Sequence, residues 1–567
     1  MTFIYFNKSP KSIAKNFRVQ FLKFLYPSFI FICTGAIISC SNKTKDQSIQ
    51  IRPNILLIVA DDLGYADLGC FGGLVETPNI DQLASRGIRF SRFHTSPLCA
   101  PTRSMLLSGN DNHIAGMGLM GYRSNTVGYE GRLTNRIATV PEVLKLAGYH
   151  TYMAGKWHLG TDSISNPAKK GFERSFVNLL GAGNHYDDQG LFSDFPKTPY
   201  TEDGKPAHWN NGDYSTDFFT DKLIEYIDSN QNDNKPFFAF AAYTSPHWPL
   251  QVDEKYWKKY EGKFDAGYEA LKKANLETLK KAGIVPEDAV LPPNSSRVKP
   301  WDSLSEDQKM MERRKMELYA GMVDNLDFNI GRLVEHLKSI GAFENTLIVV
   351  LSDNGAAAED FYYHDYFSPF LKEHFNDDYA HMGEPNSFIS YGPQWAEAGS
   401  APFKYFKGVT TEGGINTPMI MAGPGVALQN KIEDCLVTVM DLAPTFYDLA
   451  KTSYPDSING KGIYPLKGIS LVPLVSGSSK DVHGPDYVFG LEHSNMSMIR
   501  KGSWKITNLS RPFVEDSFKL YNLKQDLAEI HDQKKLHPEK YKELIEEWKT
   551  FKKDMLIQIP LLHDEEF

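Results

Sequence analysis

Short apolar runs recur along the chain, and each is followed by polar or turn residues. Four of them are NILLIVADD, HTYMAGKWH, FFAFAAYTSPH and NTLIVVLSDNG. Runs of this length with polar flanks are typical of buried parallel strands, and the helix-like segments between them favour crossover helices. The pattern therefore predicts an α/β protein with a large, mostly parallel mixed sheet flanked by helices.

A long helix is predicted over residues 304–339, because the apolar residues there keep roughly helical spacing and Gly341 supplies a C-terminal stop. Three further tracts do not fit the alternation of strands and helices. They are rich in aromatic residues or carry an extra helical pattern, and we expect them to form the rim of a pocket. These insertions span residues 181–214, 251–300 and 356–401.

After residue 477 the pattern changes to short strands, DYVFGLE, SMIRKG, SWKITNL and FKLYNL, and then to one long charged helix over residues 537–555. We expect a smaller C-terminal α+β subdomain with a short antiparallel sheet and a long helix. The domain organisation predicted for the chain is a leader at 1–40, a linker at 41–51, an α/β domain at 52–477 and this subdomain at 478–567.

The first forty residues are typical of a targeting segment. Basic residues precede the apolar stretch FLYPSFIFICTGAIIS, which is too short and too broken to span a membrane comfortably. The stretch ends Ile37-Ile38-Ser39-Cys40 and resembles a lipobox, in which Cys40 is acylated and anchors the protein to a membrane. We expect an exported periplasmic or cell-surface lipoprotein of a bacterium; a plain signal peptide and a single anchor helix are the alternatives.

Composition and charge exclude some classes of protein. The chain has 567 residues, 41% of them hydrophobic, and a formal net charge of -9, which argues against a nucleic-acid partner. Two of the five cysteines lie in the leader, so Cys70, Cys99 and Cys435 remain. Three cysteines are too few for a disulfide framework, and one of them is a candidate for chemistry.

Carboxylates follow two of the predicted strands. NILLIVA leads into Asp61-Asp62, and LIVVLS leads into Asp353-Asn354. Ligands gather at the carboxyl ends of strands in open α/β sheets. A hard cation with oxygen ligands would offset the repulsion between these carboxylates, and calcium fits the set better than zinc. The alternative is that both pairs serve as helix caps or turn residues.

Cys99 stands in SPLCAPTRSMLLSG, where Pro101 suits the start of a helix and MLL suits its body. The residue would then lie at a helix N-terminus, where backbone N–H groups favour an anion, and Arg103 would add a fixed positive charge one turn on. The alternative is a buried structural cysteine.

The pentapeptide CAPTR resembles the sulfatase signature C-x-P-x-R, the sequence that is read when a cysteine is oxidised to formylglycine. Blocks similar to the family follow one another in the expected order: ETPNIDQLASRGIRF, AGKWHLG, SPHWPL, LSDNGA and KGVTTEGGINTPMI. CAPTRSMLLSGNDNHIAGMG and the insertion ending YGPQWAEAGSAPFKYFKG resemble bacterial arylsulfatases in particular. The resemblance implies an alkaline phosphatase-like fold and the hydrolysis of a sulfate ester.

The same resemblance implies one Ca²⁺ held by Asp61, Asp62, Asp353 and Asn354 together with an oxygen of the hydrated formylglycine at position 99. That residue is a gem-diol, which offers one hydroxyl to attack sulfur and a second whose deprotonation can then expel sulfate. A serine would manage only the first half easily.

Five further residues carry roles implied by the family. Arg103 would orient the gem-diol, and Lys156 and Lys407 would neutralise charge on the sulfuryl oxygens. His247 would protonate the leaving oxygen, and His158 would remove the proton of the second hydroxyl. Substrate contacts are implied for Lys156, His247 and Lys407.

Some positions leave choices open or depart from the family. Lys407 is preferred to Lys404 because it stands five residues before Glu412 of EGG. Ala100 stands where the family often has a small polar residue after the cysteine, and Asn416 stands where many relatives have Arg. Among the other histidines, we expect a structural role for His113 and assign none to His185, His364, His374 and His381.

Two other functions remain as alternatives: a phosphodiester or phosphonate monoester hydrolase of the same superfamily, and a non-catalytic lipoprotein that binds sulfated glycans. The implied partners are a formylglycine-generating enzyme and an aryl sulfate or a sulfated carbohydrate as substrate. The sequence does not choose between these substrates.

Overall fold

The structure, a computed structural model, describes residues 52–120, 124–209 and 212–559. The expected leader, the acylated Cys40 and the linker lie outside these residues. None of the helices in the described part of the chain is both long enough and apolar enough to span a bilayer.

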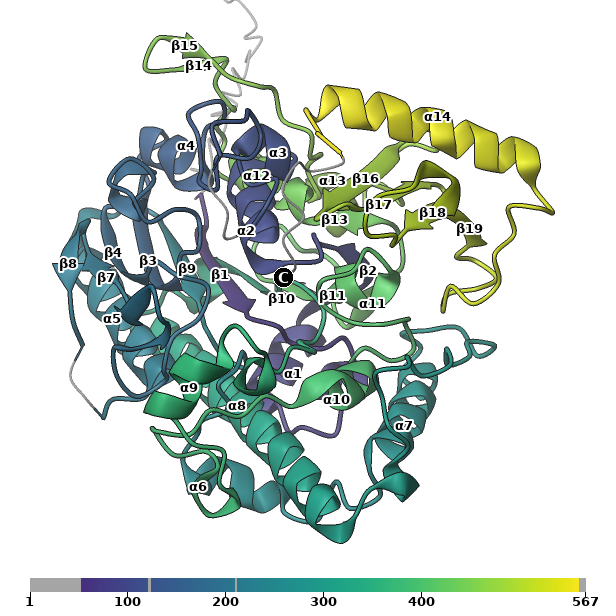
Figure 1. Cartoon of the computed structure of the whole chain (residues 1–567). Helices are drawn as coiled ribbons and strands as arrows, with labels where there is room; N and C mark the ends of the chain where they lie inside the picture. Colours follow the sequence, from purple (N-terminus) through teal and green to yellow (C-terminus); the bar gives the residue numbers. More distant parts are fainter. Residues whose placement is uncertain (1–51, 121–123, 210–211, 560–567) are drawn as a thin grey trace, which may run out of the picture. The chain divides into compact units, whose positions relative to one another are not determined.

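An eleven-stranded mixed sheet forms the centre of the fold (Figure 1). Its order is β12-β2-β11-β10-β1-β9-β3-β4-β7-β8, with β13 paired to β2. The four apolar runs of the sequence form β10 (Thr346–Ser352), β1 (Asn54–Ala60), β9 (Phe237–Ala242) and β3 (His150–Lys156), which are adjacent and parallel. The predicted α/β fold class is therefore confirmed.

The remaining strands extend this core on both sides. β4 continues the parallel set, and β12 and β13 run parallel to β2 at the far edge, whereas β11, β7 and β8 pair antiparallel with their neighbours. Their bounds are β2 (Gly87–His94), β4 (Arg174–Asn178), β7 (Tyr200–Glu202), β8 (Lys205–Ala207), β11 (Asn416–Ala422), β12 (Lys431–Glu433) and β13 (Val437–Thr438).

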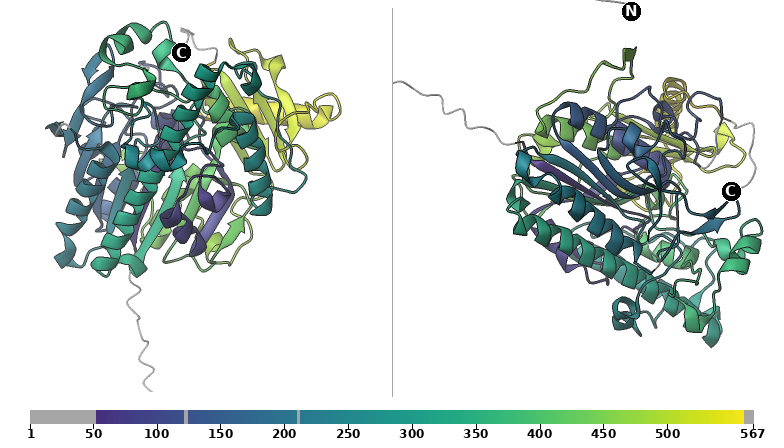
Figure 2. Two further views of the ribbon diagram at one scale, coloured as in Figure 1. Left: turned by 90° about the horizontal axis from the view of Figure 1, so that it is seen from below. Right: turned by 90° about the vertical axis from the view of Figure 1, so that its left-hand side faces the viewer.

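Both faces of the sheet are buried, which explains why the strand sequences are apolar without alternation. Along β1, Leu56 and Ile58 belong to one hydrophobic core, while Leu57 and Val59 belong to the other. Helices cover each face (Figure 2). One face carries α1 (Pro78–Ser85), α5 (Ser215–Asp228) and α8 (Glu306–Ser339), and the other carries α2 (Cys99–Ser108), α4 (Val140–Leu146) and α12 (Leu442–Leu449).

The long helix α8 matches the predicted segment to within two residues. Its N-cap Ser305 accepts from the backbone N–H of Gln308, whose side chain in turn accepts from the N-cap backbone. Gly341 follows the helix with a φ of 69°, a conformation that glycine adopts without strain.

The three insertions contain short elements of their own. The first contains the hairpin β5-β6, the second α6 and α7, and the third α9 and α10; α9 packs against β5, and α10 against α7. Their bounds are β5 (Gln189–Phe192), β6 (Phe195–Lys197), α6 (Glu254–Trp257), α7 (Tyr268–Lys281), α9 (Ser368–His374) and α10 (Gly392–Gly399).

The C-terminal part forms the predicted small antiparallel sheet and long helix. The strands are β16 (Val488–His493), β17 (Met496–Lys501), β18 (Trp504–Asn508) and β19 (Lys519–Asn522), and the helix is α14 (Pro538–Asp554). Lys501 of β17 pairs with Glu547 of α14 and so lies on the face of this sheet that α14 covers. Because successive side chains of a strand point to opposite faces, the adjacent residue Arg500 lies on the other face. Lys505 is the cross-strand partner of Arg500 and shares that face.

The described part also contains two short hairpin strands, β14 (Ser457–Ile458) and β15 (Lys461–Gly462), and three further one-turn α-helices. These helices are α3 (Asn112–Ala115), α11 (Glu412–Ile415) and α13 (Val472–Val475).

Candidate active site

The carboxyl ends of β1 and β10 set the centre of the site. The two strands are parallel with their last residues paired, so Asp61, Asp62, Asp353 and Asn354 meet at one edge of the sheet, and all four are buried. The backbone N–H of Asp62 donates to Asp353 Oδ1 at 3.3 Å, and Asn354 Nδ2 donates to Asp62 Oδ1 at 2.7 Å. The structure thus brings together the four residues that the sequence suggested as ligands.

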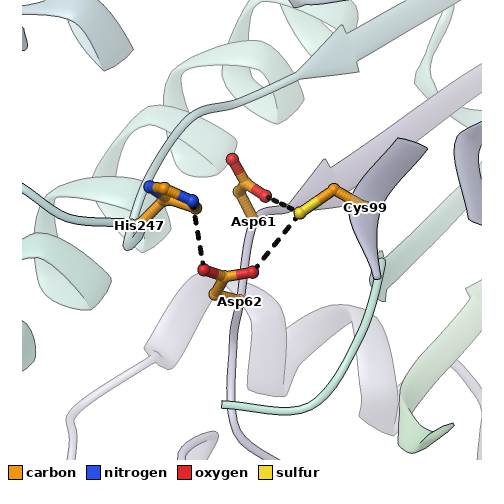
Figure 3. A group of neighbouring side chains, drawn as sticks. All are labelled: Asp61, Asp62, Cys99 and His247. Carbon is orange, nitrogen blue, oxygen red and sulfur yellow. Dashed lines mark hydrogen bonds and ion pairs between the residues drawn. The ribbon is translucent and has the colours of Figure 1, made fainter. Parts of the chain in front are cut away.

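Cys99 is the first residue of α2 and faces two of these carboxylates (Figure 3). Its Sγ lies 3.3 Å from Asp61 Oδ1 and 3.6 Å from Asp62 Oδ1. Burial raises the pKa of the Cys99 thiol well above its usual value, and Asp353 adds to the effect. An unmodified thiol in this place stays protonated, which makes it a poor nucleophile.

Two buried lysines reach the same carboxylates. Lys156, the last residue of β3, places Nζ 2.7 Å from Asp61 Oδ2, and Lys407 places Nζ 2.7 Å from Asp62 Oδ2. Burial nevertheless raises the pKa of Asp61 to about 7, against the pull of Lys156. The lysines therefore offset only part of the cost of burying these carboxylates.

Arg103 lies one turn after Cys99 on α2, and its guanidinium is fully buried. Nε and Nη2 each lie 2.8 Å from Asp353 Oδ2, and Nη1 donates to the backbone carbonyl of Lys156 at 2.9 Å. This geometry fixes the plane of the guanidinium between the ends of β10 and β3.

The donor set suits a hard cation. One possible ligand atom from each of Asp61, Asp62, Cys99 and His247 lies within 4.8 Å of the others. Asn354 Oδ1 is buried without a hydrogen-bond partner, and rotation of its amide would put this oxygen beside Asp62 Oδ1, where Nδ2 now donates. The carboxylate and amide oxygens outnumber the nitrogen donor, a balance that favours calcium over zinc.

His247 borders the carboxylates on the side of β9. Its Nδ1 lies 2.7 Å from the carbonyl oxygen of Trp248 and must donate to it, so the neutral imidazole presents a bare Nε2 toward Lys407 Nζ at 3.4 Å. Burial lowers the pKa of His247 well below its usual value, and Lys407 adds to the effect. His185, which the sequence left unassigned, lies 3.2 Å from the carbonyl oxygen of His247 through its Nε2.

His158 follows β3 by two residues and is half-buried, with a φ of 58°. Its ring lies so close to Gly181 that a Cβ there would come within 2.3 Å of it. Nδ1 has no hydrogen-bond partner, and burial together with the charge of Lys156 lowers the pKa of His158 well below its usual value. A neutral imidazole with a free nitrogen is what a general base requires.

The other candidates lie elsewhere. Lys404 Nζ donates to the carbonyl oxygen of Glu529, whereas Lys407 Nζ lies beside the carboxylate of Asp62. His113 bridges Asp111 and Glu492 at 2.9 and 2.8 Å and so ties α3 to β16. His364, His374 and His381 are exposed.

Glu359 was not recognised from the sequence, because an isolated glutamate in an insertion resembles any solvated surface residue. Its Oε1 lies 4.0 Å from Lys407 Nζ, and its Oε2 is buried without a partner. Nearby, the ring of Trp248 packs on His247 and on Phe361, with centroid distances of 4.2 and 4.9 Å. The third insertion therefore reaches the site through Glu359 and Phe361.

Comparison with known protein families shows to which family the chain belongs. The family model named Sulfatase matches residues 53–452, which include every residue of the candidate active site described above. The chain belongs to the sulfatase family. It is therefore a hydrolase whose substrate is a sulfate ester, as its signature motif implied. A second model, described as N-sulphoglucosamine sulphohydrolase, C-terminal, matches residues 403–556 of this sulfatase.

Two relatives resemble the sulfatase over most of its length. A sulfatase of Schizosaccharomyces pombe is 39% identical over 528 residues, which are 89% of this chain and 94% of the relative. The arylsulfatase of Klebsiella aerogenes is 39% identical over 430 residues, 74% of this chain and 92% of the relative. The recognition of an arylsulfatase-like protein from the sequence is thereby confirmed.

Solved structures share the fold. The crystal structure of Ps i-CgsB in complex with k-i-k-neocarrahexaose matches with a TM-score of 0.63 and 25% identity, covering 88% of this sulfatase and 92% of that chain.

Asn416 departs from the family pattern and is buried at the start of β11. It is in register with His94 of β2, and neither atom of its amide has a hydrogen-bond partner. Nothing in the structure explains this substitution.

Proposed function

We propose that this sulfatase is an arylsulfatase-type sulfuric ester hydrolase that acts through a formylglycine formed from Cys99, beside one Ca²⁺. The observation that supports this most strongly is the position of Cys99 Sγ, at the first turn of α2 and 3.3 Å from Asp61 Oδ1. An oxygen at this position can share a cation with the carboxylates, whereas the protonated thiol cannot.

Five residues would hold the cation: Asp61, Asp62, Asp353, Asn354 and the modified residue 99. A bound Ca²⁺ supplies positive charge that favours a deprotonated hydroxyl on residue 99. It also stabilises the carboxylate form of Asp61, whose pKa burial otherwise raises to about 7.

Lys156, Lys407 and Arg103 then act on the sulfate group. With the carboxylates held by a cation, both ammonium groups can donate to sulfuryl oxygens, where negative charge builds during transfer. Arg103 is fixed by Asp353 and orients residue 99 from the next turn of the same helix.

His247 and His158 would move the two protons. A bound sulfate ester brings negative charge next to His247, which offsets burial and Lys407 and allows Nε2 to carry a proton to the leaving oxygen. His158, held neutral by burial, would accept the proton of the second hydroxyl at residue 99.

For the alcohol part of the substrate we propose a sulfated carbohydrate in nature and aryl sulfates as assay substrates. Glu359 supports a hydroxyl-bearing substrate, because its buried Oε2 is a free acceptor beside Lys407. Two similar proteins point the same way: an N-acetylglucosamine-6-O-sulfatase of Bacteroides thetaiotaomicron, 27% identical over 92% of this chain, and the structure solved with a neocarrahexaose.

The direct test compares initial rates on nitrophenyl sulfate and nitrophenyl phosphate for the wild type and Cys99→Ala. We expect faster turnover of the sulfate and a loss of at least about 10³-fold in the variant, because the nucleophile is gone. Faster turnover of the phosphate would favour a phosphoester or phosphonate hydrolase instead. Sulfated-glycan binding without turnover of either ester would favour the non-catalytic glycan-binding lipoprotein.

We further propose that the sulfatase is exported as a lipoprotein and that another enzyme modifies its Cys99. A lipid on Cys40 would hold the enzyme at a bacterial membrane, and a formylglycine-generating enzyme would act on the CAPTR segment before folding buries it. Cys40→Ser should release the protein from the membrane fraction of its host; unchanged membrane association would contradict the lipid anchor.

A further inference from the structure

Glu412, the first residue of α11, is buried among charged partners. Its Oε1 lies 2.8 Å from Lys505 Nζ, and its Oε2 lies 2.8 Å from His94 Nε2. Its backbone N–H donates to Glu529 Oε2 at 2.6 Å, and Lys505 Nζ also lies 3.0 Å from Glu529 Oε1. Arg500 Nη1 lies 3.1 Å from His94 Nε2. We call these five residues the Glu412 cluster.

The members of the Glu412 cluster come from two parts of the chain. Lys505 and Arg500 lie on the face of the small C-terminal sheet that is turned away from α14, and Glu529 follows β19. His94 ends β2 of the large sheet. A buried ion pair loses much of its stabilisation when one partner is removed, because the other charge is left without compensation. The position of α11 therefore depends on the C-terminal sheet.

Helix α11 also contacts the turn after β10 that carries Asp353 and Asn354. The N–H of Gly355, next to Asn354, donates to the carbonyl of Gly414 at 3.1 Å. A Cβ on Gly355 would lie 2.0 Å from the carbonyl oxygen of Gly413, so the turn after β10 and α11 are in direct backbone contact.

Lys407 is fixed by the same segment. Its backbone N–H donates to the carbonyl of Ala356 at 3.0 Å, and Thr411 Oγ1 donates to the carbonyl of Lys404 at 2.7 Å. Residues 404–414 thus run from the Glu412 cluster to the turn that carries Asp353 and Asn354, and the side chain of Lys407 projects from this segment to Asp62.

We propose that Lys505 and Glu529 are positioning residues of the active site. Through Glu412 they set α11 and residues 404–414 against the 353–355 turn, which places Lys407 and the cation ligands. The C-terminal sheet is then part of the catalytic architecture. The cation part of this inference rests on the proposed calcium site; the placement of Lys407 does not.

The test measures kcat and KM on nitrophenyl sulfate, calcium affinity by titration calorimetry and the thermal midpoint for Lys505→Met and Lys505→Arg. We expect Lys505→Met to lower kcat about 10- to 100-fold and to weaken calcium binding about tenfold, because Glu412 and Glu529 lose the ammonium group that they share and Arg500 is a more distant partner, 4.0 Å from Glu412 Oε2. Lys505→Arg should recover most of both, since it restores the charge.

Lys501→Met is the matched control, because Lys501 lies on the neighbouring strand and pairs with Glu547 on the other face of the same sheet. It should leave kcat and calcium affinity at wild-type values. If Lys505→Met does not fold, Lys505→Met combined with Glu529→Gln removes one charge of each sign and provides the same measurements in a balanced cluster; its kcat should lie closer to the wild type than that of Glu529→Gln alone.

A lower thermal midpoint in Lys505→Met with unchanged kcat and calcium affinity would overturn the inference, because it would show a purely structural role. So would a kcat for the Lys505→Met, Glu529→Gln pair no higher than that of Glu529→Gln. A wild type without sulfatase activity or calcium binding would instead contradict the proposed function, so the two failures are distinguishable.

Discussion

Lys404 and Lys407 lie three residues apart, yet only Lys407 reaches the carboxylates. Lys404 Nζ bonds to a backbone carbonyl, whereas Lys407 Nζ lies 2.7 Å from Asp62 Oδ2. The spacing to Glu412 favoured Lys407, but a shift by one turn was conceivable. The geometry therefore places Lys407, and not Lys404, beside the carboxylates, while its catalytic role stays a proposal.

Lys407→Ala should lower kcat/KM on nitrophenyl sulfate about 10²- to 10³-fold, because it removes a buried charge that would face the sulfuryl oxygens of a bound substrate under the proposed function. Lys404→Ala should stay within about twofold of the wild type, since its Nζ contacts none of the strand-end carboxylates and donates only to the backbone carbonyl of Glu529. Steady-state kinetics of the two variants side by side check this. Equal losses in both would contradict the assignment.

Sequence reasoning identified the strand-end residues because their signal is local. An apolar run followed by Asp-Asp or Asp-Asn marks a buried strand and the polar edge at its end. The Glu412 cluster has no such signal. Lys505 alternates with Trp504 and Ile506 in SWKITNL and so resembles the solvated face of an amphipathic strand, and only the packing of the small sheet on α11 reveals its partners.

At the scale of elements, α3 is tied to β16 by a buried charged histidine. Burial favours the neutral ring of His113, but Asp111 and Glu492 outweigh it and raise the pKa to about 9. Since this pKa is higher than the unfolded value, the histidine stabilises the fold fully below pH 6.5, and the contribution is lost as the pH rises through 9.

His113→Gln should therefore be less stable than the wild type, by more at low pH than at high pH. The difference between 6.5 and about 9 corresponds to about 3 kcal/mol of pH-dependent stability. Urea unfolding of both proteins at about pH 6 and about pH 10 measures it, because the other titrating groups are common to both. A difference in stability that does not change with pH would contradict a charged His113.

At the scale of the molecule, the sheet gathers residues that are far apart in the chain. Asp61, Cys99, Lys156, His247 and Asp353 come from five segments and meet only because the strands end, and α2 begins, at one edge of the sheet. The sheet as a whole must form before the cation site exists, so binding of the cation and folding are coupled.

Removal of calcium with a chelator should lower both the thermal midpoint and the sulfatase rate, and added Ca²⁺ should restore them. At about 100 times its Kd, a ligand that binds only the folded state contributes about 2.7 kcal/mol. Mg²⁺ should restore less, because it keeps its waters and demands stricter geometry. A rate and a midpoint that ignore the chelator would contradict a structural and catalytic calcium.

The proposed function requires that residue 99 is no longer a cysteine in the active enzyme. Mass spectrometry of the peptide that contains residue 99, from protein made in its native host, tests this most directly. The proposed function predicts that the peptide has lost sulfur and gained an aldehyde oxygen. An active preparation in which this peptide carries only the unmodified thiol would contradict it.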